Sequence, residues 1–222
     1  MSLSRLLSIP RGLTAIIGGG GKTTMLYTLA AELAQQGTVI CTTTTHIFPP
    51  DHIPLLLDPT ADQISAALAD APCICVGRPG PSGKLEAPTL SMEALCALAD
   101  FVLVEADGSR GLPIKAHLPH EPVIPACAGT VVQVVGNSGF GRPVSEVAHR
   151  PEKFCALSGL SPEAPVTPEA VAAVIRQEAF ASLVFVNQAE DGLSAARQLA
   201  ACLPGIPVCG GSLQRRCWEC VS

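Results

Sequence analysis

The chain has 222 residues and a net charge of −5; 48% of its residues are hydrophobic and only 15% are charged. Such a chain is too apolar to be disordered, and too acidic to bind nucleic acid through a basic face. Its mean hydropathy of +0.38 is high, but no apolar run approaches the about 18 residues of a transmembrane helix. The N-terminus also lacks a signal-peptide pattern. We therefore predict a cytoplasmic protein with no membrane and no nucleic-acid partner, whose strands are buried on both faces.

Short β-branched runs alternate along the chain with stretches of helical periodicity. In chain order we expect a strand at 13–17, a helix over 25–33 that ends by Gly37, a strand at 38–42, a proline-rich loop, a helix at 61–71, a strand at 72–76, a loop or hairpin tip at 78–88, a helix at 91–98, a strand at 101–105, a long proline-rich loop at 107–128, a strand at 130–135, a helix at 168–177, a strand at 182–186, a helix at 192–202 and a strand at 206–209. This alternation predicts an α/β fold with a mostly parallel sheet in a single domain over residues 1–222. A loop as long as 107–128 is usually functional.

The strongest chemical signal is a glycine loop between the first predicted strand and the first predicted helix. It consists of Gly18, Gly19, Gly20, Gly21, Lys22, Thr23 and Thr24. Glycines let backbone N–H groups converge on phosphate oxygens, and the helix N-terminus adds a partial positive charge. Lys22 is expected to reach the β- and γ-phosphates, and Thr23 to place a hydroxyl on Mg²⁺. The loop therefore predicts a three-layer P-loop NTPase-like fold that takes ATP or GTP with Mg²⁺.

Other interpretations of this loop stay open. The spacing is short, because Ile16 and not glycine stands five residues before Gly21, and this shorter form resembles the phosphate loop of Mur-type ligases. A dinucleotide-binding loop would need a small residue at position 23 and an acid about 20 residues further on. The chain has Thr23 there, and threonines at the end of the second predicted strand. The last possibility is a plain turn with a chance lysine.

Two acids end the predicted strand 101–105 and are candidates for metal binding. Glu105 and Asp107 are two residues apart, so an extended backbone places both on one side. Phosphate-loop hydrolases hold magnesium with a carboxylate at such a position, directly or through water. We predict that Glu105 and Asp107 serve the metal and the catalysis, together with Lys22. The alternative is that they only begin a turn.

Further polar residues follow the predicted strands. Thr43 and Thr44 close the second strand and are candidates for a metal, a γ-phosphate or another anion, or they simply fill the strand. In the long loop, Arg110 and Lys115 are expected to meet an anionic substrate. His117, His120 and Glu121 superficially resemble a zinc motif, but the prolines at 113, 119 and 122 exclude the helix that such motifs need.

Asn187 begins the segment Asn-Gln-Ala-Glu-Asp after the strand at 182–186. Guanine-binding proteins carry N-K-x-D at such a place, so we expect Asn187 to contact the nucleotide. Here Gln188 replaces the lysine and Glu190 replaces the aspartate, which leaves two possibilities for Glu190. It either accepts hydrogen bonds from a base edge, or belongs to an acid pair at a helix N-terminus.

Ten cysteines are unusual for a cytoplasmic chain, where disulfides are rare. Most of them lie inside apolar patterns and are expected to be inert, buried thiols. Cys217 and Cys220 form the one C-x-x-C pair, with Cys73 and Cys75 as a weaker pair. These pairs keep open a carrier of sulfur, selenium or metal.

Taken together, several segments resemble the YqeC family. They are GGGGKTT at 18–24, TTTTHI at 42–47, VEADGSRGLPIKAH at 104–117, HEPVIP at 120–125, HRPEKF at 149–154 and VNQAED at 186–191. That family is regarded as accessory factors for selenium-dependent molybdenum hydroxylases. The resemblance spans roughly residues 13–213, and it implies a P-loop nucleoside-triphosphatase fold. The functional positions that the resemblance implies are Lys22, Thr23, Glu105, Asp107, Arg110 and Lys115.

Three functions follow from these residues, and for the first the resemblance to the family implies the accessory role. The first is a magnesium-dependent protein that binds ATP or GTP, hydrolyses it slowly, and acts as an accessory factor in maturing a molybdenum hydroxylase, with that enzyme or its maturation factors as partners. The second is a ligase- or kinase-like enzyme that acts on a small metabolite. The third is a cysteine-based carrier without turnover. The sequence does not distinguish ATP from GTP.

Overall fold

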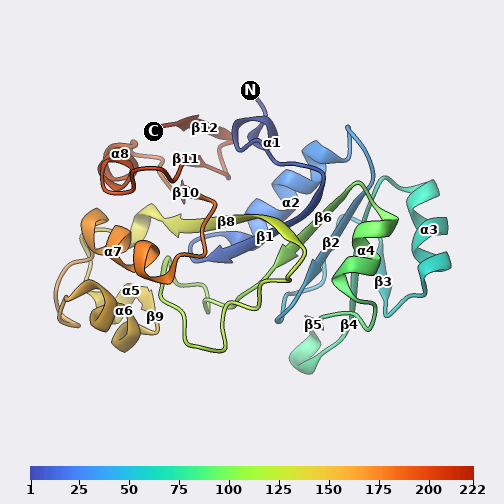
Figure 1. Cartoon of the computed structure of the whole chain (residues 1–222), viewed down its shortest axis with the longest axis horizontal. Coiled ribbons are helices and arrows are strands. Elements are labelled where there is room, and N and C mark those ends of the chain that lie inside the picture. Colours follow the sequence, from blue (N-terminus) through green and yellow to red (C-terminus); the bar gives the residue numbers. More distant parts are fainter. The chain divides into compact units, whose positions relative to one another are not determined.

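The computed structural model describes all of residues 1–222 (Figure 1). The chain divides into two compact units, each assembled from separate segments. The first unit comprises Met1–Ile16, Met25–Asp107 and Val123–Thr130, and the second comprises Ile17–Thr24, Gly108–Pro122 and Val131–Ser222. That the chain forms a single domain stays a prediction.

The first unit is built around parallel strands. Its elements are α1 (Leu3–Leu6), β1 (Gly12–Gly18), α2 (Lys22–Leu33), β2 (Val39–Thr43), β3 (Leu55–Leu57), α3 (Ala61–Asp70), β4 (Cys73–Pro79), a 3-10 turn (Pro81–Gly83), β5 (Leu85–Glu86), α4 (Met92–Leu98) and β6 (Phe101–Glu105). The end of β1 and the start of α2 belong to the second unit. The strand order is β1-β6-β2-β4-β3, all parallel, and β5 runs antiparallel to β4.

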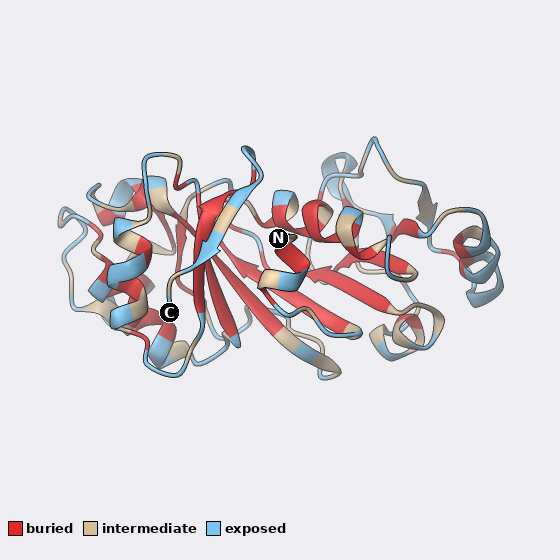
Figure 2. Ribbon diagram, turned by 90° about the horizontal axis from the view of Figure 1, so that it is seen from above, coloured by how far each residue is buried: buried red, intermediate tan, exposed pale blue.

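The strands of this unit are apolar on both faces, which is why they form its interior. All five residues of β2 and of β6 are buried, as Figure 2 shows in red. Ile40, Val102 and Leu103 have no exposed surface. Burying one such side chain stabilises the fold by about 1.5–3 kcal/mol. The high hydropathy is therefore explained by strands covered on both sides.

The second unit has its own parallel strands. Its elements are β7 (Ile114–Lys115), β8 (Ala128–Gly136), a 3-10 turn (Asn137–Gly139), α5 (Val144–Val147), β9 (Ala148–His149), α6 (Pro151–Ser158), α7 (Pro168–Glu178), β10 (Leu183–Asn187), α8 (Ser194–Ala201), β11 (Val208–Ser212) and β12 (Cys217–Cys220). Strands β8, β10 and β11 are parallel in that order, and β12 runs antiparallel to β11. Strands β7 and β9 form a separate parallel pair.

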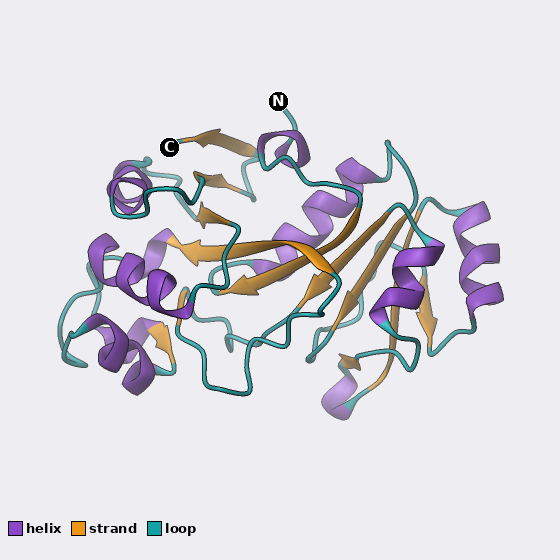
Figure 3. Cartoon of the chain, in the orientation of Figure 1, coloured by secondary structure: helices purple, strands orange, loops and turns teal.

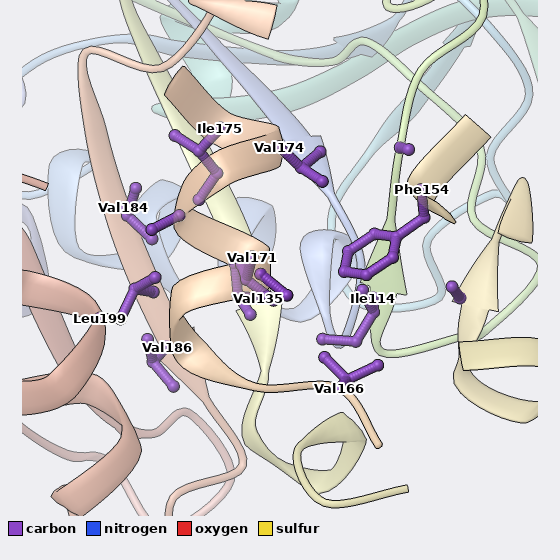
Figure 4. Packing of buried hydrophobic residues seen from close by; sticks show 14 of the residues in the cluster. Ile114, Val135, Phe154, Val166, Val171, Val174, Ile175, Val184, Val186 and Leu199 are labelled. Atoms are coloured by element: carbon purple, nitrogen blue, oxygen red, sulfur yellow. The ribbon is translucent and has the colours of Figure 1, made fainter. Parts of the chain in front are cut away.

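One hydrophobic cluster packs the helices of the second unit against its strands. Figure 4 shows Val171 and Ile175 of α7 among side chains from β8 and β10, with Phe154 of α6 close to Ile114. Helix α7 begins where the sequence favours it, because the Thr167 side chain accepts a hydrogen bond from the Ala170 N–H. Its apolar face then fills the cluster.

The predicted α/β class with a large, mostly parallel sheet flanked by helices is confirmed (Figure 3). Assignment to the phosphate-loop NTPases stays a prediction. The expected elements are present within a few residues, but the sequence predicted no helix at α1, α5 or α6 and no strand at β3, β7, β9 or β12. Strand β3 has only three residues and follows a proline, so it carries no periodicity of its own. No helix is long and apolar enough to span a membrane.

Candidate functional site: the glycine loop and its supports

The glycine loop lies in the second unit, between the end of β1 and the start of α2. At each of the four glycines an added Cβ would lie less than 3.0 Å from another atom, and Gly20 and Gly21 show the consequence. Gly20 has φ +80°, and a Cβ there would lie 2.4 Å from the Gly136 Cα atom. Gly21 has φ +124°, and its Cβ would lie 2.5 Å from Nδ2 of Asn187. Tight packing of the loop against β8 and β10 therefore requires glycine here.

Backbone hydrogen bonds anchor the loop. The Gly19 N–H donates to the Val134 carbonyl at 2.9 Å, and the Gly20 N–H donates to the Leu112 carbonyl at 3.1 Å. These two N–H groups bond to the protein, so the loop cannot offer all of its amides to an anion. The donors that face outward along a helix axis are those of the first turn, which starts at Lys22.

Lys22 is held at the loop by hydrogen bonds within its own unit. Its Nζ donates to the Gly18 carbonyl at 2.8 Å and to the Ser109 hydroxyl at 3.1 Å, and the residue is only 4% exposed. The ammonium therefore lies over the loop in a poorly solvated place, where the low effective dielectric constant strengthens its attraction to a negative charge. Sequence reasoning did not single out Ser109. It lies two residues after Asp107, inside the segment 104–117 that carries the family resemblance, but no role was predicted for it.

Asn187 connects the glycine loop with the segment after β11. Its Nδ2 donates to the Gly20 carbonyl at 2.8 Å, and its Oδ1 accepts from the Leu213 N–H at 3.0 Å. The side chain is buried, so leaving its amide groups without hydrogen-bond partners would cost free energy, and the two bonds avoid that cost. Asn187 thus positions the loop; its predicted contact with a nucleotide stays a prediction.

The neighbours of Asn187 are held in place by side-chain hydrogen bonds. The Gln188 Oε1 accepts from the Ser138 hydroxyl at 2.6 Å, and Glu190 accepts from the Ser212 hydroxyl. That hydrogen bond, with the charge of Arg215, lowers the pKa of Glu190. Helix α8 begins only at Ser194 and has no acid in its first turn, so the expectation of an acid pair at that helix N-terminus is wrong.

Glu105 and Asp107 lie in the first unit, at the end of β6. Both are buried. Thr43 stands beside Glu105 in the parallel register of β2 and β6, and its hydroxyl donates to the Glu105 carbonyl at 2.8 Å. The Thr44 hydroxyl donates to the Val123 carbonyl at 2.7 Å. The two threonine hydroxyls therefore donate their protons to backbone carbonyls near the end of the strand. Only their oxygen lone pairs stay available to bind a metal.

The cationic residues of the long loop have different surroundings. Lys115 is buried, and its Nζ donates to the Glu121 carboxylate at 2.9 Å and to the Gly108 carbonyl. Arg150, preceding α6, donates through Nε to the other Glu121 oxygen at 2.8 Å. Burial alone would raise the pKa of Glu121, but these two cations outweigh it and hold that pKa at about 2. Arg110 is exposed and lines a pocket.

His117 ties the long loop to α7. Its backbone N–H and its ring Nδ1 bond to the two carboxylate oxygens of Glu178, at 2.6 and 2.7 Å. The pair is almost fully buried, with side-chain exposures of 1% and 5%. The buried hydrogen bonds to Glu178 therefore explain the presence of a histidine at position 117 without a metal-binding role.

The cysteines are free thiols, and several are buried in strands. Cys217 and Cys220 are three residues apart in β12, so their side chains point to opposite faces of the strand. Across the ladder they stand opposite Ser212 and Cys209. No group of three or more His, Cys, Asp or Glu side chains is placed to hold a metal ion. The C-x-x-C spacing therefore does not make a chelating pair here.

Comparison with known proteins places this geometry in a family. The family model described as YqeC protein matches residues 14–152. The chain belongs to the YqeC family. It is 35% identical over 170 residues to the "Uncharacterized protein YqeC" of Escherichia coli (strain K12). The match covers 73% of this chain and 66% of that relative, just under two thirds of its length. No solved structure matches the chain.

The matched range contains the glycine loop, Ser109 and the long loop, but not Asn187. It also contains His149 and Arg150, to which the sequence analysis assigned no role. Their segment, HRPEKF at 149–154, contributes to the family resemblance, but neither residue was predicted to belong to a site. A basic dipeptide before a helix start was the signal that could have drawn attention to them.

Proposed function

We propose that this protein binds a nucleoside triphosphate, ATP or GTP, with Mg²⁺ at the glycine loop, hydrolyses it slowly, and serves the maturation of a molybdenum hydroxylase. The observation that carries the nucleotide part is the environment of Lys22. Its ammonium lies over a loop of glycines at the start of a helix, held by Gly18 and Ser109. A lysine ammonium beside a helix N-terminus favours the binding of the negatively charged phosphates of a nucleotide.

Five of the predicted residues have a role in this proposal. Lys22 would neutralise charge on the β- and γ-phosphates while the first turn of α2 donates N–H groups to them. Thr23, Glu105 and Asp107 offer a hydroxyl and carboxylates, the hard oxygen donors that Mg²⁺ prefers. The metal would supply charge neutralisation on the phosphates. Asn187 would keep the loop in its binding shape through Gly20.

The deciding experiment is a calorimetric titration of ATP and GTP, each with and without Mg²⁺. Wild type is expected to bind at least one of them, more tightly with the metal. Lys22→Ala should lose tenfold or more, about the effect of removing one charged hydrogen-bond donor. Lys22→Met, which keeps the chain length, should behave alike. Lys84→Ala, which removes a half-buried lysine of the first unit, is the control.

Two results would contradict the nucleotide proposal. One is that neither nucleotide binds at millimolar concentration. The other is that both Lys22 variants, shown by circular dichroism to be folded, bind as tightly as wild type.

The maturation role rests on the family alone. A host without this protein should produce its selenium-dependent molybdenum hydroxylase with reduced activity. Wild type should restore that activity and Lys22→Ala should not. Full hydroxylase activity in the deleted host would remove this part of the proposal while leaving nucleotide binding untouched.

A second candidate is a ligase- or kinase-like enzyme for a small metabolite. One observation favours it: a basic pocket in the second unit shares a chain segment with the glycine loop. Under this candidate a small molecule, and not a protein partner, would stimulate turnover.

A further inference from the structure

A pocket of about 280 Å³ opens in the second unit and has no role in the nucleotide proposal. Its wall includes Arg110 and Leu112 from the long loop, and His149, Arg150 and Glu152 from the region where β9 meets α6. Pockets for small molecules begin at about 300 Å³. The pocket therefore suits a small metabolite better than a nucleoside triphosphate.

The pocket and the glycine loop share one stretch of chain, residues 109–112. Ser109 accepts a hydrogen bond from the Lys22 ammonium at 3.1 Å. Leu112 accepts from the Gly20 N–H at 3.1 Å through its carbonyl, and also lines the pocket. A ligand in the pocket would therefore contact the segment that supports the phosphate-binding lysine.

The charge around the pocket favours an anion. Lys115 and Arg150 share the single negative charge of Glu121. The Arg150 contact uses Nε only, which leaves its two terminal NH₂ groups without a hydrogen bond in the protein. The Arg110 guanidinium makes no hydrogen bond within the protein either. Glu152 is the one further carboxylate in the wall, so positive charge is in excess.

Backbone conformation at the pocket supports a role for these side chains. Arg110 has φ +51° and Arg150 has φ +68°, a left-handed conformation that glycine would adopt without strain. Each such residue costs roughly 1 kcal/mol or more. Two strained arginines at one pocket indicate that their guanidinium groups, and not the local backbone, are what the site needs.

We propose that this pocket binds a small phosphate monoester, as a ligand separate from the nucleotide. Arg110 and Arg150, from two separate chain segments, line the pocket together with His149. A carboxylate presents two oxygens in one plane, whereas a phosphate monoester presents three oxygens in different directions and up to two negative charges, which suits two guanidinium groups on separate segments. Glu152 would accept from a hydroxyl or N–H group on the rest of the ligand.

The test uses methyl phosphate and inorganic phosphate as probes, with calorimetry and NMR of the histidine imidazoles at pH 7. Wild type should bind both, and the His149 signal should shift. Arg110→Gln should raise the Kd about tenfold, the effect of losing one charge-assisted hydrogen bond. Arg110→Lys should restore part of the affinity. Arg142→Gln removes an exposed arginine outside the pocket wall and is the matched control.

The same titration in Lys22→Ala separates this proposal from nucleotide binding. Methyl phosphate should still bind to Lys22→Ala, whether or not ATP or GTP does. Loss of all phosphate binding in Lys22→Ala would place the phosphate at the glycine loop and overturn the proposal. Equal affinity of Arg110→Gln and wild type would overturn it too. So would acetate that displaces methyl phosphate with equal affinity, because the ligand would then be a carboxylate.

Discussion

Glu121 shows how a single residue can organise a loop. Its two carboxylate oxygens are divided between Lys115, within the same loop, and Arg150, which lies 29 residues further along the chain. The residue belongs to a pattern that superficially resembles a zinc motif, yet both of its carboxylate oxygens accept hydrogen bonds from cationic side chains. Its role in the structure is to hold the start of α6 next to the long loop.

The low pKa of Glu121 makes a pH-dependent prediction. Because its pKa is about 2 in the folded chain against an ordinary 4.5, its contribution to stability is complete above pH 4.5. That contribution is lost as the pH falls toward 2. We expect Glu121→Gln to be less stable than wild type at pH 7, and the difference to shrink on acidification.

Urea unfolding at pH 7 and near pH 3 measures this difference. Glu146→Gln is the control, because Glu146 is 55% exposed and pairs with Arg142 on the surface. It should change little at either pH. A destabilisation by Glu121→Gln that is the same at both pH values would contradict the assigned ion pairs.

At the scale of elements, the glycine loop is shaped by what packs against it. Gly20 fits against Gly136 at the end of β8, and Asn187 at the end of β10 bonds to its carbonyl. Three segments distant in sequence thus determine one turn. The conformation of the glycine loop is therefore a property of the second unit and not of the glycine-rich heptapeptide alone.

A matched pair of glycine variants tests this dependence. Gly20 and Gly141 have similar φ angles, +80° and +77°, but a Cβ at Gly141 meets no atom within 4 Å. Gly141→Ala should cost about 1 kcal/mol through backbone strain alone. Gly20→Ala adds a clash with backbone and should cost about 1–3 kcal/mol more, measured by urea unfolding. It should also weaken nucleotide binding. Equal destabilisation by the two variants would show that the loop has room.

For the whole molecule, bound nucleotide should stabilise the fold by mass action. At a concentration of 100 times Kd, the free energy of unfolding rises by about 2.7 kcal/mol. For a chain of this length that corresponds to roughly 5–10 °C in Tm. We expect this rise with Mg²⁺ and ATP or GTP in a thermal scan. Mg²⁺ alone should not produce it, and Lys22→Ala should lose it. An undiminished rise in Lys22→Ala would assign the nucleotide to another site.

Much of the fold could be predicted from local patterns. Strand 101–105 is an apolar run with acids after it, and its predicted bounds agree with β6. Helix α7 has a threonine cap, a proline at its start and apolar residues at helical spacing. In contrast, β3 and β12 are short, and they are strands only because β4 and β11 offer a free edge to pair with. Such pairing is not encoded within the strand itself.

The sequence by itself determined the α/β class, the place of the glycine loop after a buried strand, and the family. These follow from short-range spacing and from the close agreement of several motifs. Only the tertiary structure decided that Ser109 supports Lys22, that Glu121 joins Lys115 to Arg150, and that Arg110 and His149 line one pocket. The physical reason is that the Arg150–Glu121 and Lys22–Ser109 contacts join residues 29 and 87 positions apart. Local propensity carries no information about which distant side chains meet when the chain folds.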